Sequence, residues 1–141
     1  MPILPDPHLT PGATDSRVTQ ENIHQTICVP DYTARVRPSS SRMRRIKRQV
    51  LADYGISGIP LADFELDHLI SLELGGAPDD VLNLWPEVYE RSGRVRRGTG
   101  AETKDKLEDR LHRLVCAGRM SLEEAQRSIA GDWLAAWRAL N

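Results

Sequence analysis

Apolar residues recur at helical spacing in the first half of the chain. Met43, Ile46 and Val50 lie three or four positions apart within residues 41–55, which predicts one buried face of a helix. The serines at the start of this segment supply an N-cap, and Gly55 is suited to the C-terminal end of the helix. The pattern therefore predicts a helix over most of the segment.

Two further helices are expected towards the end of the chain. Residues 101–117 place leucines and a valine on one face, and Gly118 follows as a stop signal. The last helix begins at Ser121, and Glu124 stands three residues further on, so that the two residues form a capping box. The spacing predicts two helices in succession.

The centre of the chain alternates imperfectly between apolar and polar positions over residues 64–74. This irregularity favours a hairpin with a bend near His68 over one straight strand. Gly75 and Gly76 allow the chain to turn tightly and return. Residues 83–86 are expected to open a short irregular element.

The remaining segments complete the predicted organisation. Residues 1–18 are rich in Pro, Gly, Asp and Thr, and we expect an extended or disordered arm. A short helix is expected between residues 19 and 28, and residues 91–100 form a basic, glycine-containing loop. The element order predicts an α+β domain dominated by helix, with residues 19–141 forming a single domain.

Bulk composition excludes few classes of function. The length of 141 residues, the hydrophobic content of 40% and the net charge of −1 are ordinary for a globular protein. No run approaches the roughly 20 apolar residues that a membrane span needs, so no span is expected. The distribution of charge is more informative. The predicted helix over residues 41–55 carries a run of Arg and Lys, which is either a solvated face or a phosphate-binding face.

The two cysteines, Cys28 and Cys116, lack the spacing of a zinc or redox motif. Two alternatives remain, which are two buried thiols or one disulfide that closes a long loop, and we favour the disulfide. In the chain-entropy model it would contribute on the order of 4 kcal/mol. A disulfide implies an oxidising compartment, so we expect a periplasmic or secreted protein. The first residues do not form a signal peptide.

The pair Asp67-His68 stands in an otherwise apolar segment. Buried ionisable groups must be paired or must bind a metal. If the sequence offered only these two residues, the simplest interpretation would be a buried Asp–His pair whose members bind each other. Here the pair is followed by Gly75, Gly76 and Asn83, so the wider pattern favours a functional site.

At these residues the sequence resembles the HNH endonuclease family, and the matching positions are Asp67, His68, Leu69, Gly75, Gly76, Asn83 and Leu84. The run DHLIxLELGGxPxDxxNLWPE is similar to a branch of small bacterial HNH-like proteins. The similarity extends to the residues around Cys28 and Cys116 and to the Lys104–Leu111 region. The resemblance implies a ββα-metal core hairpin and helix, surrounded by additional helices, in an HNH-like nuclease domain.

The chemistry that the resemblance implies is phosphodiester hydrolysis assisted by one divalent metal. His68 would be the general base, and Asp67 would be a ligand of Mg²⁺ or Mn²⁺, with Zn²⁺ or Ni²⁺ as alternatives. Asn83 would orient His68 through its side-chain carbonyl or approach the metal. Trp85 is expected to pack in the core rather than stack on a base.

Two positions depart from the family pattern. Ser71 replaces a proline that shapes the bend, and Ser92 stands nine positions after Asn83, where a metal-binding histidine is expected. The last ligand is therefore expected on the helix over residues 101–117. Glu108 is the first choice and His112 the second, among the candidates Asp105, Glu108, Asp109 and His112.

Substrate contacts are expected from basic side chains that would flank the site, which are Arg44, Arg48, Arg94, Arg96, Arg97 and Lys104. We expect a monomeric endonuclease that acts on DNA, with RNA as a further substrate, and has low sequence specificity. If the protein is a toxin or effector, its partner would be an inhibitor or immunity protein. The alternatives are a catalytically inactive ββα-metal module that binds nucleic acid or the envelope, and a purely structural metal site.

Overall fold

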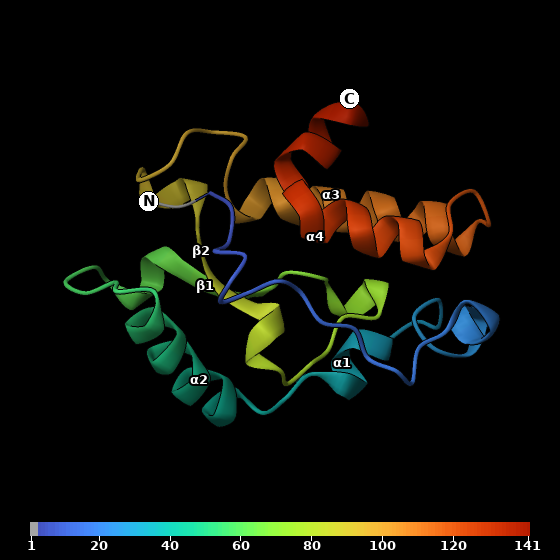
Figure 1. Cartoon of the computed structure of the whole chain (residues 1–141), viewed down its shortest axis with the longest axis horizontal. Coiled ribbons are helices and arrows are strands. Elements are labelled where there is room, and N and C mark those ends of the chain that lie inside the picture. The colour runs from blue at the N-terminus through green and yellow to red at the C-terminus, as the bar shows by residue number, and fades with distance from the viewer. Residues whose placement is uncertain (1–2) are drawn as a thin grey trace.

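The computed structural model describes residues 3–141 and shows an α+β architecture, as predicted (Figure 1). Short 3-10 turns, of which the first is Gln20–Gln25, connect the main elements. The main elements are α1 (Tyr32–Val36), α2 (Ser40–Asp53), β1 (Phe64–His68), β2 (Leu84–Val88), α3 (Ala101–Cys116) and α4 (Leu122–Ala139). Within residues 3–141, no helix is long and apolar enough to cross a membrane.

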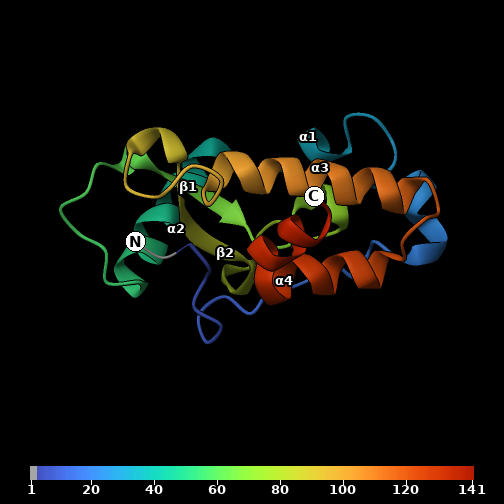
Figure 2. The same ribbon diagram turned by 90° about the horizontal axis from the view of Figure 1, so that it is seen from above.

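The three long helices form where helical spacing predicts them. The hydroxyl of Ser39 accepts a hydrogen bond from the Arg42 amide at the start of α2, and Ser121 caps α4 through the Glu124 amide. Helices α3 and α4 lie side by side (Figure 2). Their facing residues are fully buried in the main core, namely Leu107, Leu111, Ile129 and Trp133.

The hairpin differs from its prediction. Strand β1 ends at His68, and its antiparallel partner is β2, which pairs Asp67 with Trp85 and His68 with Leu84. The chain therefore does not fold back directly at the two glycines, and the segment expected to be irregular is a regular strand. Residues 69–83 form a compact connection instead, because the buried side chain of Asn83 binds their backbone.

The N-terminal arm lacks helix, but it is packed against the domain rather than disordered. Gly12 donates its amide to Leu82 O at 2.9 Å, and Thr14 forms a bridge with Gly76. The indole of Trp133 donates to Ile3 O at 2.8 Å. Residues 3–18 thus join the interstrand connection to α4, whereas the first two residues of the predicted arm lie outside the described part.

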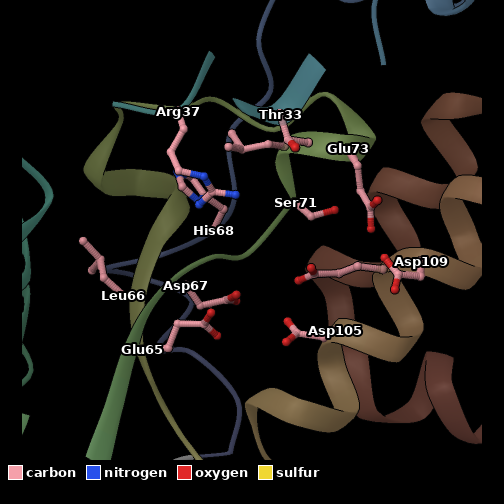
Figure 3. Close-up of a pocket in the computed structure, with 12 residues that line it drawn as sticks. Thr33, Arg37, Glu65, Leu66, Asp67, His68, Ser71, Glu73, Asp105 and Asp109 are labelled. Atoms are coloured by element: carbon pink, nitrogen blue, oxygen red, sulfur yellow. The ribbon is translucent and has the colours of Figure 1, made fainter. Parts of the chain in front are cut away.

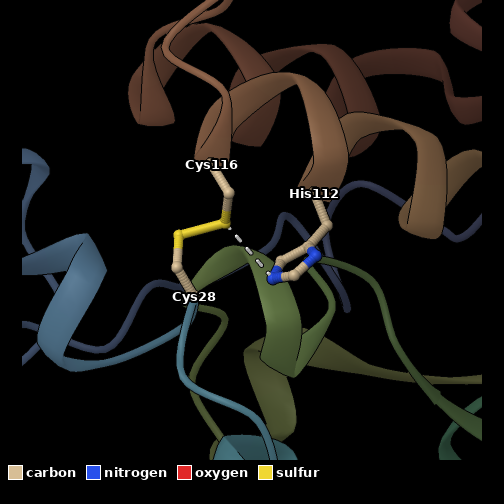
Figure 4. Close-up of side chains that lie close together, drawn as sticks. All are labelled: Cys28, His112 and Cys116. Atoms are coloured by element: carbon tan, nitrogen blue, oxygen red, sulfur yellow. Dashed lines mark hydrogen bonds between the residues drawn. A yellow bond between two sulfur atoms is a disulfide. The ribbon is translucent and has the colours of Figure 1, made fainter.

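The predicted disulfide is present. Cys28 and Cys116 are bonded, with a Cα–Cα distance of 5.8 Å and a sequence separation of 88 (Figure 4). The bond attaches the segment after Gln20–Gln25 to the C-terminal end of α3. It therefore fixes the C-terminal end of α3, while the other end of this helix reaches the hairpin.

Candidate active site

A cavity of about 310 Å³ lies between β1, α1 and α3, and most of its lining side chains are charged or polar (Figure 3). In this view Asp67 and Asp105 point toward each other from opposite walls. The lining residues are Thr33, Arg37, Glu65, Leu66, Asp67, His68, Ser71, Leu72, Glu73, Asp105, Glu108 and Asp109. The predicted residues Asp67, His68 and Glu108 are therefore brought together.

Strand alternation concentrates acidic side chains on one face of the hairpin. Glu65 and Asp67 are two residues apart on β1, and Glu87 is directly opposite Glu65 on β2. One carboxylate oxygen of each residue lies within 4.8 Å of the other two. Regular pairing of two short strands thus holds three carboxyl groups together.

Lys104 of α3 projects toward this acidic face and is fully buried. Its Nζ lies 2.8 Å from Asp67 Oδ2 and 2.6 Å from Glu108 Oε2, and it also donates to His68 O at 3.1 Å. Burial opposes the charge, but the carboxylates of Asp67 and Glu108 outweigh it and raise the pKa of Lys104. The structure thus corrects the role predicted for Lys104, because its ammonium joins hairpin to helix and does not face solvent.

The single positive charge of Lys104 cannot neutralise all the acidic groups around it. Burial, reinforced by neighbouring carboxylates, raises the pKa of Glu65 to about 8 and the pKa of Asp105 to about 6. Burial likewise raises the pKa of Glu108 to about 8 despite the Lys104 ammonium. Burial and the Asp67 carboxylate also raise the pKa of Glu87 well above its usual value. The cluster therefore favours either protons or an added cation.

His68 is 7% exposed, and its Nε2 lies 2.9 Å from the carbonyl oxygen of Pro78. A carbonyl can only accept, so Nε2 carries the proton and Nδ1 is left as the basic nitrogen of the neutral ring. Burial lowers the pKa of His68. Asp67 precedes it in β1, and the Trp85 indole fixes the Asp67 carboxylate by donating to Oδ2 at 2.7 Å. The ring is thus in the form that a general base requires.

Asn83 has a different task from the one predicted. Its side-chain carbonyl accepts from the Ile70 amide at 2.9 Å, and its amide group donates to Ile70 O and Ala77 O, each at 3.0 Å. The expected contact with the His68 ring is replaced by the contact to Pro78. Asn83 therefore shapes the connection between the strands and affects His68 indirectly.

The candidate ligands on α3 separate into two groups. Asp105, Glu108 and Asp109 line the cavity, whereas His112 does not. The Nε2 of His112 donates to Ile27 O at 2.8 Å and lies 3.5 Å from Cys116 Sγ of the disulfide (Figure 4). The second-choice ligand is thus placed away from Asp67, because it lies near the C-terminal end of the helix.

The predicted basic residues lie outside the cavity lining. Arg44, Arg48, Arg94, Arg96 and Arg97 are exposed. The guanidinium of Arg94 is paired with the carboxylate of Asp63, with Nε 2.8 Å from Oδ2. The arginine that does line the cavity, Arg37, follows α1 and was not predicted.

The structure also adds acidic residues that helical spacing and motif matching do not reveal. Glu65 was available from strand alternation, since it stands two residues before Asp67. Glu87 required knowledge that residues 84–88 form the partner strand, and Pro86 obscured that signal. Glu73 reaches the cavity from the 3-10 turn Leu72–Leu74. Trp85 is fully buried, as predicted.

Comparison of the chain with protein-family models, curated protein sequences and solved structures gives no match. Assignment of the site therefore rests on its own geometry. The decisive features are the cavity, the orientation of His68 and the concentration of carboxyl groups.

Proposed function

We propose that the protein is a metal-dependent phosphodiester hydrolase that cleaves DNA, and RNA as a further substrate, with low sequence specificity. The observation that carries this proposal is the contact of His68 Nε2 with Pro78 O, which leaves Nδ1 as the unprotonated nitrogen of a ring that lines the same cavity as Asp67. Such a base accepts a proton from an attacking water. The carboxyl groups nearby supply the ligands for a cation.

The residues fit a hard divalent metal. Carboxylate oxygens suit Mg²⁺ or Mn²⁺, and the buried oxygens Glu65 Oε2, Glu87 Oε1 and Glu87 Oε2 lack hydrogen-bond partners. When bound, the metal would polarise the phosphate and stabilise the leaving oxygen. Asp67 is the predicted ligand next to the base in the sequence, whereas His112 lies outside the cavity lining, between Ile27 O and the disulfide.

The order of elements supports the resemblance to HNH endonucleases. Asp67 and His68 end β1, Asn83 precedes β2, and α3 follows with acidic residues toward the hairpin. Ser71, which stands where the family has proline, has a φ of −63°, within the range that a proline ring imposes. The backbone at this bend is therefore compatible with the family residue.

The test is cleavage of supercoiled plasmid by the oxidised protein with Mg²⁺ or Mn²⁺. We expect nicking that EDTA abolishes and that His68→Ala reduces by about 100-fold or more, as for loss of a general base. Added imidazole should restore part of the activity of His68→Ala. The exposed His24 offers the matched control, because His24→Ala should leave cleavage unchanged. Absence of cleavage with every divalent metal would exclude the hydrolase.

A second candidate function is an inactive module that binds nucleic acid or the envelope. It is favoured by Lys104, whose ammonium pairs with the carboxylates of Asp67 and Glu108 and so competes with a metal for them. In this case DNA binding would persist without cleavage and would weaken in Arg44→Ala and Arg48→Ala. Fluorescence anisotropy with labelled DNA distinguishes the two candidates.

The disulfide is consistent with a location outside the cytoplasm. A periplasmic or secreted location, a monomeric state and an inhibitor or immunity protein as partner are parts of the same proposal. Intact mass after fractionation would test the location, because the secreted form should contain no free thiol.

A further inference from the structure

Glu87 is the most deeply buried of the three clustered carboxyl residues on the hairpin. Its side chain lies on β2, is 1% exposed and has no hydrogen-bond partner at either carboxylate oxygen. A buried carboxyl group without a partner is unfavourable and requires an explanation. The oxygens of Glu65 and Asp67 lie within 4.8 Å of it, so the explanation must be sought among these groups.

The hairpin presents these three carboxyl groups as a preformed set. Glu65 and Glu87 are opposed in the strand register, and Asp67 follows on the same face. Oxygens that share one Mg²⁺ or Mn²⁺ ion lie about 3 Å apart, since each metal–oxygen distance is about 2.1 Å. The three oxygens lie within 4.8 Å of one another, so side-chain rotations would have to close the set around one cation.

The side of the cluster nearest α3 is already occupied by a positive charge. The ammonium of Lys104 binds Asp67 Oδ2 and Glu108 Oε2, and the Trp85 indole also donates to Asp67 Oδ2. A metal placed between Asp67 and Glu108 would meet this ammonium. Within residues 3–141 these two contacts with Asp67 both engage Oδ2, and Asp67 Oδ1 has no hydrogen bond, so this oxygen would be available to a cation.

We propose that the divalent cation is held by the hairpin through Glu65, Asp67 and Glu87, with Glu87 as the buried anchor, and not by a ligand from α3. Lys104 marks the boundary of this site by fixing Glu108 away from the metal. The role of the cation in catalysis rests on the proposed hydrolase. Binding of the cation is a separate property that requires no substrate.

The test is titration of the full-length, oxidised protein with Mn²⁺ in a calorimeter, without nucleic acid. We expect Glu87→Gln to weaken Mn²⁺ binding at least tenfold, and Glu108→Gln to change it less than threefold. Glu123→Gln serves as a matched control, because Glu123 is exposed on α4 and pairs with Arg127. Glu65→Gln provides a second variant at the opposed strand position, and melting curves establish that each variant is folded.

A spectroscopic measurement locates the ion independently. Because Trp85 donates to Asp67 Oδ2, bound Mn²⁺ should quench tryptophan fluorescence, and Glu87→Gln should shift this quenching to higher Mn²⁺ concentration. Loss of binding in Glu108→Gln with retention in Glu87→Gln would overturn the hairpin site, as would absence of binding to the wild type. Binding without cleavage would refute the hydrolase and leave the hairpin site standing. Cleavage with unchanged Mn²⁺ binding in Glu87→Gln would refute the site alone.

Discussion

Lys104 is the residue on which the electrostatics of the site depend. Its burial is complete, and two carboxylates hold its ammonium at hydrogen-bonding distance. Removal of one partner of a buried ion pair destabilises the fold, because the remaining charge has neither water nor a partner. If the Lys104 ammonium were removed, the carboxylates of Asp67 and Glu108 would face each other with no cation between them.

Lys104→Met should therefore destabilise the metal-free protein by about 3–5 kcal/mol at pH 8. The loss should be smaller at pH 6, because protonation relieves the repulsion between Asp67 and Glu108. Urea denaturation followed by circular dichroism measures both values. Lys106→Met is the control, since Lys106 is exposed on the same helix. Equal stability of the two variants would contradict a structural role for Lys104.

Among the elements, the connection between the two strands leaves no space for a side chain at Gly76. A Cβ atom added at Gly76 would lie 1.7 Å from Ile70 O and 2.9 Å from Asn83 Nδ2. The backbone oxygen cannot move without breaking the contacts of Asn83. The position thus requires glycine because of close approach, and not because of an unusual φ angle.

We expect Gly76→Ala to cost more than about 3 kcal/mol of unfolding free energy or to prevent folding, since the clash is with backbone. Gly118→Ala is an informative comparison. Gly118 has a φ of +74° but open space around it, so its replacement should cost only about 1 kcal/mol. Chemical denaturation gives the unfolding free energy of each of the two variants, and near-ultraviolet circular dichroism shows whether each is folded. Similar losses in the two variants would show that the approach to Ile70 is unimportant.

The long helices were accessible from the sequence because their signals are local. Apolar spacing and capping residues such as Ser121 act within a few positions, and the observed bounds follow them closely. The hairpin was predicted less well, because the partner of β1 lies beyond a long connection. Its pairing depends on backbone contacts of Asn83 that no short pattern encodes.

The site follows the same division between local and distant signals. Asp67 and His68 are adjacent in the sequence, and Glu108 was predicted from the position of its helix; all three line the cavity. Glu87 was not predicted as a site residue, because the proline in its segment obscured the strand. His112 shares a helix with Glu108, but one further turn carries it to the disulfide.

For the whole molecule, the acidic cavity links folding to pH. Burial raises the pKa of Glu65, Glu73 and Glu108, each to about 8, so the folded state binds these protons more tightly than the unfolded chain does. Stability from such groups is present at low pH and is lost as pH rises towards 8. His68 acts in the opposite direction, because its pKa is lowered, but its effect ends near pH 6.5.

The metal-free protein should therefore melt at lower temperature at pH 8.5 than at pH 7. A loss of about 1 kcal/mol would correspond to a shift of roughly 3–6 °C for a chain of this size. Mn²⁺ should reverse the shift by replacing the missing protons, and Glu65→Gln should reduce it. Thermal unfolding at both pH values, with and without Mn²⁺, makes the comparison. Stability that stays constant or increases between pH 7 and 8.5 would contradict the assigned charges.

The N-terminal arm has a consequence for the order in which the molecule assembles. Ile3 accepts the Trp133 indole across 130 positions, and Gly12 is bonded to the connection before β2. Contacts between such distant positions form slowly, because a large loop must close before they contribute. During synthesis the partners of Gly12 and Thr14 are made before α4, so the bond between Ile3 and Trp133 is the last of these contacts that can form. We therefore expect a nascent chain to complete the acidic cavity once α3, which supplies Asp105, Glu108 and Asp109, has been released, and to fix the arm on α4 only afterwards.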